Sequence, residues 1–166
     1  MLTKCRNILR NEKGLTLIEL LAVVVILGII AAIAIPSIGG LIENSKKDAH
    51  VANAQQMISS AKLAVTSEPS LQPTSATNGA KFISLKYLVD KGYLENPKDP
   101  HGSTYNTLAA AQTSFVAADA GASYVKVSTT DGVQFAFEVV LVNNGSPVRG
   151  INNLTAERSL SRTSVN

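Results

Sequence analysis

The stretch Lys13-Gly14-Leu15-Thr16-Leu17-Ile18-Glu19-Leu20-Leu21 joins a basic leader to a long apolar run, and one carboxylate lies inside that run. No polar side chain occurs from Leu20 to Ile35. An ionisable group within a membrane-length segment costs about 2.5–3.5 kcal/mol on insertion scales, so it indicates a function and a partner. That partner must explain why Glu19 follows Gly14 by only five residues.

The charge of the chain is concentrated in the leader. Residues 1–14 carry four basic side chains against Glu12, whereas the remainder has eleven basic and eleven acidic residues, so the net charge of +3 belongs to the leader. Cationic residues beside an apolar segment keep that flank in the cytoplasm. We therefore expect a single-pass membrane protein with a cytoplasmic N-terminus, and nothing in the neutral remainder indicates a nucleic-acid-binding surface.

Cysteine usage excludes one common means of stabilisation. Cys5, in the leader, is the only cysteine of the chain, so no intramolecular disulfide can form. An exported domain of this size must then depend on its hydrophobic core alone.

The apolar run at residues 15–35 has three interpretations. As a helix its 21 residues span about 31 Å, which matches a hydrocarbon core of about 30 Å. A secretory signal would be shorter and would be cut near Ala34, but the helical pattern continues beyond that residue. A plain membrane anchor fits the length and leaves Glu19 unexplained. The third interpretation is a precursor that is processed at the junction with the leader.

The junction at residues 13–21 resembles the class III signal of the type IV pilin and pseudopilin superfamily. The resemblance implies cleavage after Gly14 by a membrane-embedded prepilin peptidase and methylation of the new amino terminus at Leu15, where the family usually has phenylalanine. Gly28 and Pro36 stand where many members have a helix-loosening glycine and proline. The resemblance is strong over about the first quarter of the chain and weaker beyond Ser67.

Glu19 acquires a partner under this interpretation. Cleavage would leave a positively charged amino terminus on Leu15, in equally apolar surroundings. Within one subunit Glu19 lies about one helical turn away, and a carboxylate in the first turn also interacts favourably with the helix dipole. The resemblance implies instead that Glu19 neutralises the terminus of a neighbouring subunit during assembly. In both cases the loss of one charge leaves the other buried alone.

The helix is expected to extend from residue 15 to about 67, with a kink near Pro36. Residues 15–35 form the transmembrane and assembly part, and residues 36–67 form an amphipathic continuation. Two apolar stripes follow the proline, the first at Ile38, Leu41, Ile42, Ala49 and Ala52. The second stripe is predicted to face a C-terminal sheet and consists of Val51, Ala54, Ile58, Ala61 and Val65. The residues expected on solvated or inter-subunit surface are Lys46, Lys47, Asp48 and His50.

Residues 68–166 are expected to form a globular C-terminal domain, so the predicted fold is α+β, a long helix packed on an antiparallel sheet of three or four strands. Pro69 and Pro73 mark a loop at residues 67–80, and a short helix follows at residues 82–91. Strands are predicted at residues 114–118, 123–129 and 133–142, with a short final strand near 148–151. Residues 153–160 suit a helical turn, followed by a frayed tail.

No catalytic constellation is present, so the chain is not predicted to be an enzyme and no cofactor or metal site is expected. The histidines, His50 and His101, lie in different settings. Residues 87–100 resemble a connecting segment of some pilins and major pseudopilins, which often have an aromatic residue in place of His101. Some of those relatives bind calcium through clustered carboxylates, whereas Asp99, Asp119 and Asp131 are dispersed here.

The resemblance implies a structural subunit of a type IV pilus-like filament, which lies in the cell membrane before assembly and in an extracellular pilus afterwards. The implied partners are further copies of the chain, the prepilin peptidase and methyltransferase, membrane lipid, and an inner-membrane assembly platform with its ATPase. Adhesion, motility, DNA uptake and secretion all remain open roles. The alternatives are a minor pilin or pseudopilin of a secretion or competence system, a single-span anchored extracellular binding domain, and a secreted hydrolase.

Overall fold

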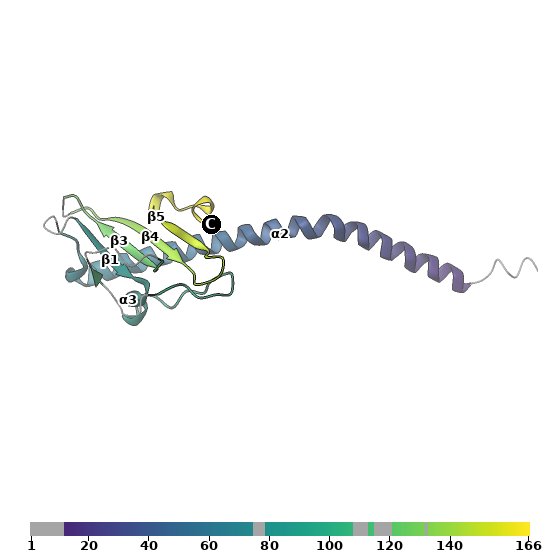
Figure 1. Cartoon of the computed structure of the whole chain (residues 1–166), viewed down its shortest axis with the longest axis horizontal. Helices are drawn as coiled ribbons and strands as arrows, with labels where there is room; N and C mark the ends of the chain where they lie inside the picture. The colour runs from purple at the N-terminus through teal and green to yellow at the C-terminus, as the bar shows by residue number, and fades with distance from the viewer. Residues whose placement is uncertain (1–11, 75–78, 108–112, 115–120, 132) are drawn as a thin grey trace, which may run out of the picture. The chain divides into compact units, whose positions relative to one another are not determined.

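The computed structural model describes residues 12–74, 79–107, 113–114, 121–131 and 133–166 (Figure 1). Most of the predicted leader, residues 115–118 of a predicted strand, and Asp119 lie outside the described residues. The chain divides into two compact units, Met1–Glu43 and Asn44–Asn166, and helix α2 (Glu12–Ser67) contributes to both.

In the first unit, the described part is the N-terminal portion of α2. Its large apolar side chains from Leu17 to Ile42 are 51% to 71% exposed. The helix passes through Pro36 without interruption, so the predicted kink does not break it. A methyl group added at Gly28 would meet no atom within 4 Å, so no contact with the described residues requires a glycine there.

The second unit contains one antiparallel sheet. Its strands follow the order β2-β1-β3-β4-β5, and each neighbouring pair is antiparallel. The bounds are β1 (Ala80–Ser84), β2 (Thr113–Ser114), β3 (Tyr124–Ser128), β4 (Ala136–Val142) and β5 (Gly150–Ala156). Four strands of five to seven residues form the body of the sheet, and β2 adds a two-residue edge. The predicted α+β fold is confirmed.

The two central strands have the alternation that their sequences predict. Val125 and Val127 of β3 are fully buried, and Val125 pairs with the equally buried Val139 of β4. On the opposite face, Lys126 and Glu138 pair across the same two strands with 2.7 Å between Nζ and Oε2. The period of two therefore places one face of the sheet in the core and leaves the other partly exposed.

Helix α2 supplies the other side of this core. In Figure 1 the part of α2 that leads to Ser67 runs alongside the labelled strands of the sheet. The second apolar stripe lies where it was predicted, because four of its five members are buried in the core and Val51 packs against it. The helix residues of the core cluster are Ala54, Met57, Ile58, Ala61, Ala64 and Val65.

The prediction of a helix at residues 82–91 was wrong in its first half. Residues 80–84 form β1, which pairs with β3 on one side and β2 on the other, and helix α3 (Leu85–Asp90) begins only afterwards. The Ser84 hydroxyl accepts a hydrogen bond from the Tyr87 amide at 3.1 Å and caps α3. The pairing of β1 with a strand on each side outweighs the weak local helical pattern of residues 82–84.

The end of the chain also differs from the prediction. β5 extends to Ala156, through residues expected to form a helical turn, and a 3₁₀ turn, η3 (Glu157–Ser159), follows. Its polar side chains are tolerated because β5 is an edge strand, which among the described strands pairs with β4 alone. The tail is not frayed, since Val165 is buried and the Asn166 amide donates to the Gly150 carbonyl at 3.1 Å.

Candidate functional site

The predicted processing site lies in the first turns of α2. Gly14 and Leu15 both fall within the helix, which begins at Glu12. A cut between them would remove three residues from α2 and leave Leu15 as the new first residue of the helix. The side chains of residues 12–15 lie outside the described part of the chain.

Glu19 is the only acid in the exposed apolar surface that follows. Ile18 and Leu20, its neighbours in sequence, are 67% and 66% exposed, and Glu19 is exposed as well. Its carboxylate makes no hydrogen bond or ion pair with any side chain that the structure describes. Four residues of α-helix correspond to a rise of about 6 Å, so Leu15 and Glu19 lie about one turn apart. In this position the Glu19 carboxylate can pair with a positive charge, either on an amino terminus produced by cleavage or on another molecule.

We call residues 16–42 of α2 the apolar segment. It forms part of a helix that is long and apolar enough to cross a membrane by length and composition. It contains Gly28 and Ala32, a small-xxx-small pair that allows close approach of a second helix. Such a surface is stable only in lipid or against other apolar surfaces, since a soluble monomer rarely exposes a patch of this extent.

The comparisons with known proteins concern this segment first. Residues 9–35 match the prokaryotic N-terminal methylation motif, a region that includes Gly14, Leu15 and Glu19. This motif belongs to the type IV pilin and pseudopilin superfamily. The match therefore supports placing the chain in that superfamily. Type II secretion system core protein G of Klebsiella pneumoniae is 27% identical over 112 residues, which cover 63% of this chain and 79% of that protein. No solved structure matches.

The second unit contains a polar cluster that the sequence did not reveal. His50 was predicted on solvated or inter-subunit surface, but it is fully buried within the chain, with Nε2 3.0 Å from Nδ1 of His101. Oδ1 of the buried Asp99 lies 3.5 Å from the same His50 nitrogen. We call His50, Asp99 and His101 the histidine cluster. The two histidines were expected in different settings, and 51 residues separate them, so no sequence spacing links them.

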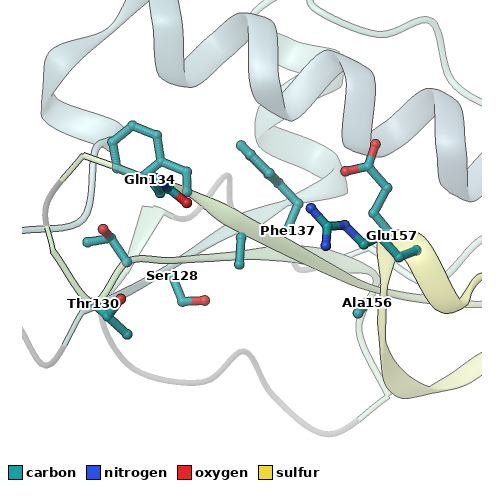
Figure 2. A pocket seen from close by; sticks show the side chains of 10 residues that line it. Ser128, Thr130, Gln134, Phe137, Ala156 and Glu157 are labelled. Atoms are coloured by element: carbon teal, nitrogen blue, oxygen red, sulfur yellow. The ribbon is translucent and has the colours of Figure 1, made fainter.

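The groove in Figure 2 is a separate feature of the second unit. It lies where the end of β3 and the beginning of β4 meet the end of β5. Phe137, Ala156 and Glu157 are among the residues that line it. The Glu157 carboxylate is 2.5 Å from the Lys62 ammonium, which lies 5.4 Å from the centre of the Phe137 ring. The remaining lining consists of Ser128, Thr129, Thr130, Gln134, Phe135, Ala136 and Arg158. The described lining offers no second carboxylate for general acid–base chemistry.

Proposed function

We propose that the chain is a structural subunit of a type IV pilus-like filament, processed after Gly14 and polymerised through the apolar segment. The observation that carries this proposal is the run of exposed large apolar side chains around one carboxylate, Glu19. The match to the methylation motif supports the same assignment. Before assembly the subunit lies in the membrane as a single-pass protein. On assembly it leaves the membrane, and contacts between helices replace the contacts with lipid.

The charge of Glu19 would select the register of assembly. A carboxylate in the fibre core is costly unless it is neutralised, and the amino terminus of Leu15 on an adjacent subunit supplies the opposite charge. Such a head-to-tail contact joins different surfaces of two copies, so it repeats without closing and generates an open filament. The processed terminus and Glu19 are then two halves of one recognition element, and the first half exists only after cleavage.

A second candidate is a pseudopilin of a secretion system. It is favoured by the relative described above, whose name assigns it to type II secretion. The two candidates share the processing and assembly steps and differ in the length and location of the fibre. Electron microscopy of sheared cell-surface material tests this difference, since a major pilin yields long surface fibres at native expression. A pseudopilin yields none there, and its deletion blocks protein export.

Mass spectrometry of the mature N-terminus tests the common part of both candidates. A methylated Leu15 is the expected result. An intact Met1 would contradict the proposal and indicate an anchored binding domain that keeps its leader. A terminus at Ile35 would equally contradict it, because it indicates a secreted protein cut after Ala34.

Replacement of Glu19 tests the role of the carboxylate. Glu19→Ala should insert into the membrane and be cleaved after Gly14, yet give a low yield of filaments in a strain that lacks the native subunit. The matched control is Glu95→Ala, since Glu95 is an exposed acid in the second unit. Normal filament yield from Glu19→Ala, with the control also normal, would refute the proposed charge neutralisation.

A further inference from the structure

The histidine cluster joins two parts of the second unit that are distant in sequence. His50 belongs to α2, whereas Asp99 and His101 lie on the segment that connects α3 to Tyr105. The side chains of His50 and Asp99 are completely buried, and that of His101 is 14% exposed. Two imidazoles and a carboxylate thus meet in a site that is buried except at His101.

The Asp99 carboxylate is oriented by its surroundings. Oδ2 accepts hydrogen bonds from Nδ2 of Asn143 at 2.9 Å and from the Ser103 amide at 3.1 Å. Oδ1 accepts one from the His101 amide at 3.1 Å and faces both imidazoles. Burial raises the pKa of this carboxyl, but the hydrogen bonds outweigh it and leave the pKa below its ordinary value. The carboxylate is therefore held in one orientation by three hydrogen bonds, with Oδ1 facing two ring nitrogens.

The His50 ring is oriented from its other side. Nδ1 of His50 lies 2.9 Å from the Tyr105 hydroxyl, which Nδ2 of Asn53 also contacts at 2.9 Å. When Nδ1 carries the proton and donates a hydrogen bond to the Tyr105 hydroxyl, the lone pair of Nε2 faces His101 Nδ1, 3.0 Å away. A histidine that ligates a metal is usually held in this way, by a hydrogen bond at the nitrogen that does not bind.

The three inward atoms have the separation of metal ligands. His50 Nε2, His101 Nδ1 and Asp99 Oδ1 are 3.0, 3.5 and 3.8 Å apart, and a point equidistant from them lies about 2.0 Å from each. That length equals the Zn–N and Zn–O bonds of protein sites, about 2.0–2.2 Å. Calcium and magnesium are disfavoured, since each requires about six or more oxygen ligands.

We propose that His50, Asp99 and His101 bind one divalent transition-metal ion of the zinc type, with water in the fourth position. The ion would link α2 to the segment after α3. It would act as a cross-link in a domain that has no cysteine and so cannot form a disulfide. Metal binding to a folded site adds its free energy to folding, so the site would stabilise the second unit. The proposal does not depend on the proposed function, because it concerns a bond within one subunit.

The test uses the full chain in detergent, without a histidine tag and with Cys5→Ser, so that neither a tag nor the leader thiol binds metal. The protein is stripped with EDTA and titrated with zinc chloride by calorimetry, and its melting temperature is measured in both states. We expect one zinc ion per chain and a higher melting temperature with zinc. No saturable binding, or the same melting temperature with zinc as with EDTA, would overturn the proposal.

Substitution of His101 assigns the ion to the cluster. His101→Gln changes the ligand with some exposure, so it disturbs folding less than a change at the fully buried His50. We expect it to weaken zinc binding at least about tenfold while its melting temperature in EDTA stays near that of the parent chain. The control, Asp90→Asn, alters an exposed acid and should bind like the parent. Equal zinc affinity in His101→Gln and the parent would contradict the assignment.

Cobalt provides a readout that needs no variant. Co²⁺ in a tetrahedral site with nitrogen and oxygen ligands gives strong visible absorption, whereas octahedral Co²⁺ in water gives weak absorption. We expect the stripped chain to acquire the strong absorption with one equivalent of cobalt and to lose it on addition of zinc. A spectrum that stays that of aqueous cobalt would overturn the proposal.

Discussion

The hydroxyl of Tyr105 lies 2.9 Å from Nδ1 of His50, and both residues are buried. The same hydroxyl is 2.9 Å from Nδ2 of Asn53, which also donates to the Lys98 carbonyl at 3.0 Å. One phenol therefore links two side chains of α2 to the segment that follows α3. Burial raises the pKa of Tyr105 to about 12, so the hydroxyl is neutral at every physiological pH.

Tyr105→Phe should destabilise the second unit even in the absence of metal. The substitution keeps the ring and leaves the polar atoms of His50 and Asn53 without their shared partner. A buried group that loses its hydrogen bond costs about 1–3 kcal/mol. The measurement is a urea titration of the full chain in detergent with EDTA, followed by circular dichroism.

The matched control is Tyr124→Phe. Tyr124 packs edge-on against Phe82, with ring centres 5.5 Å apart, and its hydroxyl makes no hydrogen bond to a residue that the structure describes. Its loss should change the free energy of unfolding by less than about 0.5 kcal/mol. Equal costs for the two substitutions would show that the Tyr105 hydroxyl contributes nothing specific.

Glu68, the first residue after α2, forms hydrogen bonds with two tyrosines. Its carboxylate accepts hydrogen bonds from the hydroxyls of Tyr87 at 2.6 Å and Tyr93 at 2.9 Å, and these bonds lower the pKa of Glu68 from its ordinary value of 4.5. A lowered pKa stabilises the folded state fully above pH 4.5 and loses this effect as the pH falls through the folded value. Acid should therefore weaken the attachment of α3 to the end of α2.

The opposite sign applies to Tyr87. Burial, with the bond to Glu68, raises its pKa from 10 to about 12, so its contribution is complete below pH 10 and is lost as the pH rises through about 12. The difference in unfolding free energy between the parent chain and a Tyr87→Phe, Tyr93→Phe double variant should be constant from about pH 5 to 9. It should shrink below pH 4.5, and a difference that keeps its full size at pH 3 would refute the role of Glu68.

The parts of the fold that could be predicted are those with a strong period of their own. The second stripe of α2 repeats every three or four residues, and the structure buries it against the sheet. The alternation of Val125 and Val127 likewise predicts β3, and Val139 predicts a buried position in β4. Here the local pattern and the tertiary contacts agree, so the pattern was sufficient.

The parts that were missed depend on partners elsewhere in the chain. β1 is a strand because β3 lies beside it, and β5 contains Asn152 and Asn153, which have low strand propensity. The histidine cluster is the extreme case. The position of His50 on α2 suggests a polar surface, and only the arrival of Asp99 and His101 from the following segment makes it a buried site.

Gly150→Ala should strongly destabilise the sheet. Gly150 opens β5 with φ of +128°, and a methyl group there would overlap the carbonyl oxygen of Leu141 on β4. Since that oxygen belongs to the backbone, relief requires a shift of a whole strand. The expected cost is about 3 kcal/mol or more, from the sum of backbone strain and overpacking.

Gly92→Ala separates these two contributions. Gly92 also has a positive φ, +76°, but an added methyl group there meets no atom within 4 Å. Only the backbone strain of about 1–2 kcal/mol should remain. If urea titrations give the same loss for Gly150→Ala and Gly92→Ala, the close approach of β5 to Leu141 is not the cause.

The contact between α2 and the sheet should depend on one face of the helix. Ile58 is fully buried in the core and Leu63 is 55% exposed, although both belong to the part of α2 in the second unit. Ile58→Ala should cost about 2–5 kcal/mol because it leaves a cavity, whereas Leu63→Ala should cost less than about 0.5 kcal/mol. Both values come from urea titrations of the full chain. If Leu63→Ala proved the more costly, the exposed face of α2 would be the one that packs, and the assignment of the second stripe to the sheet would be wrong.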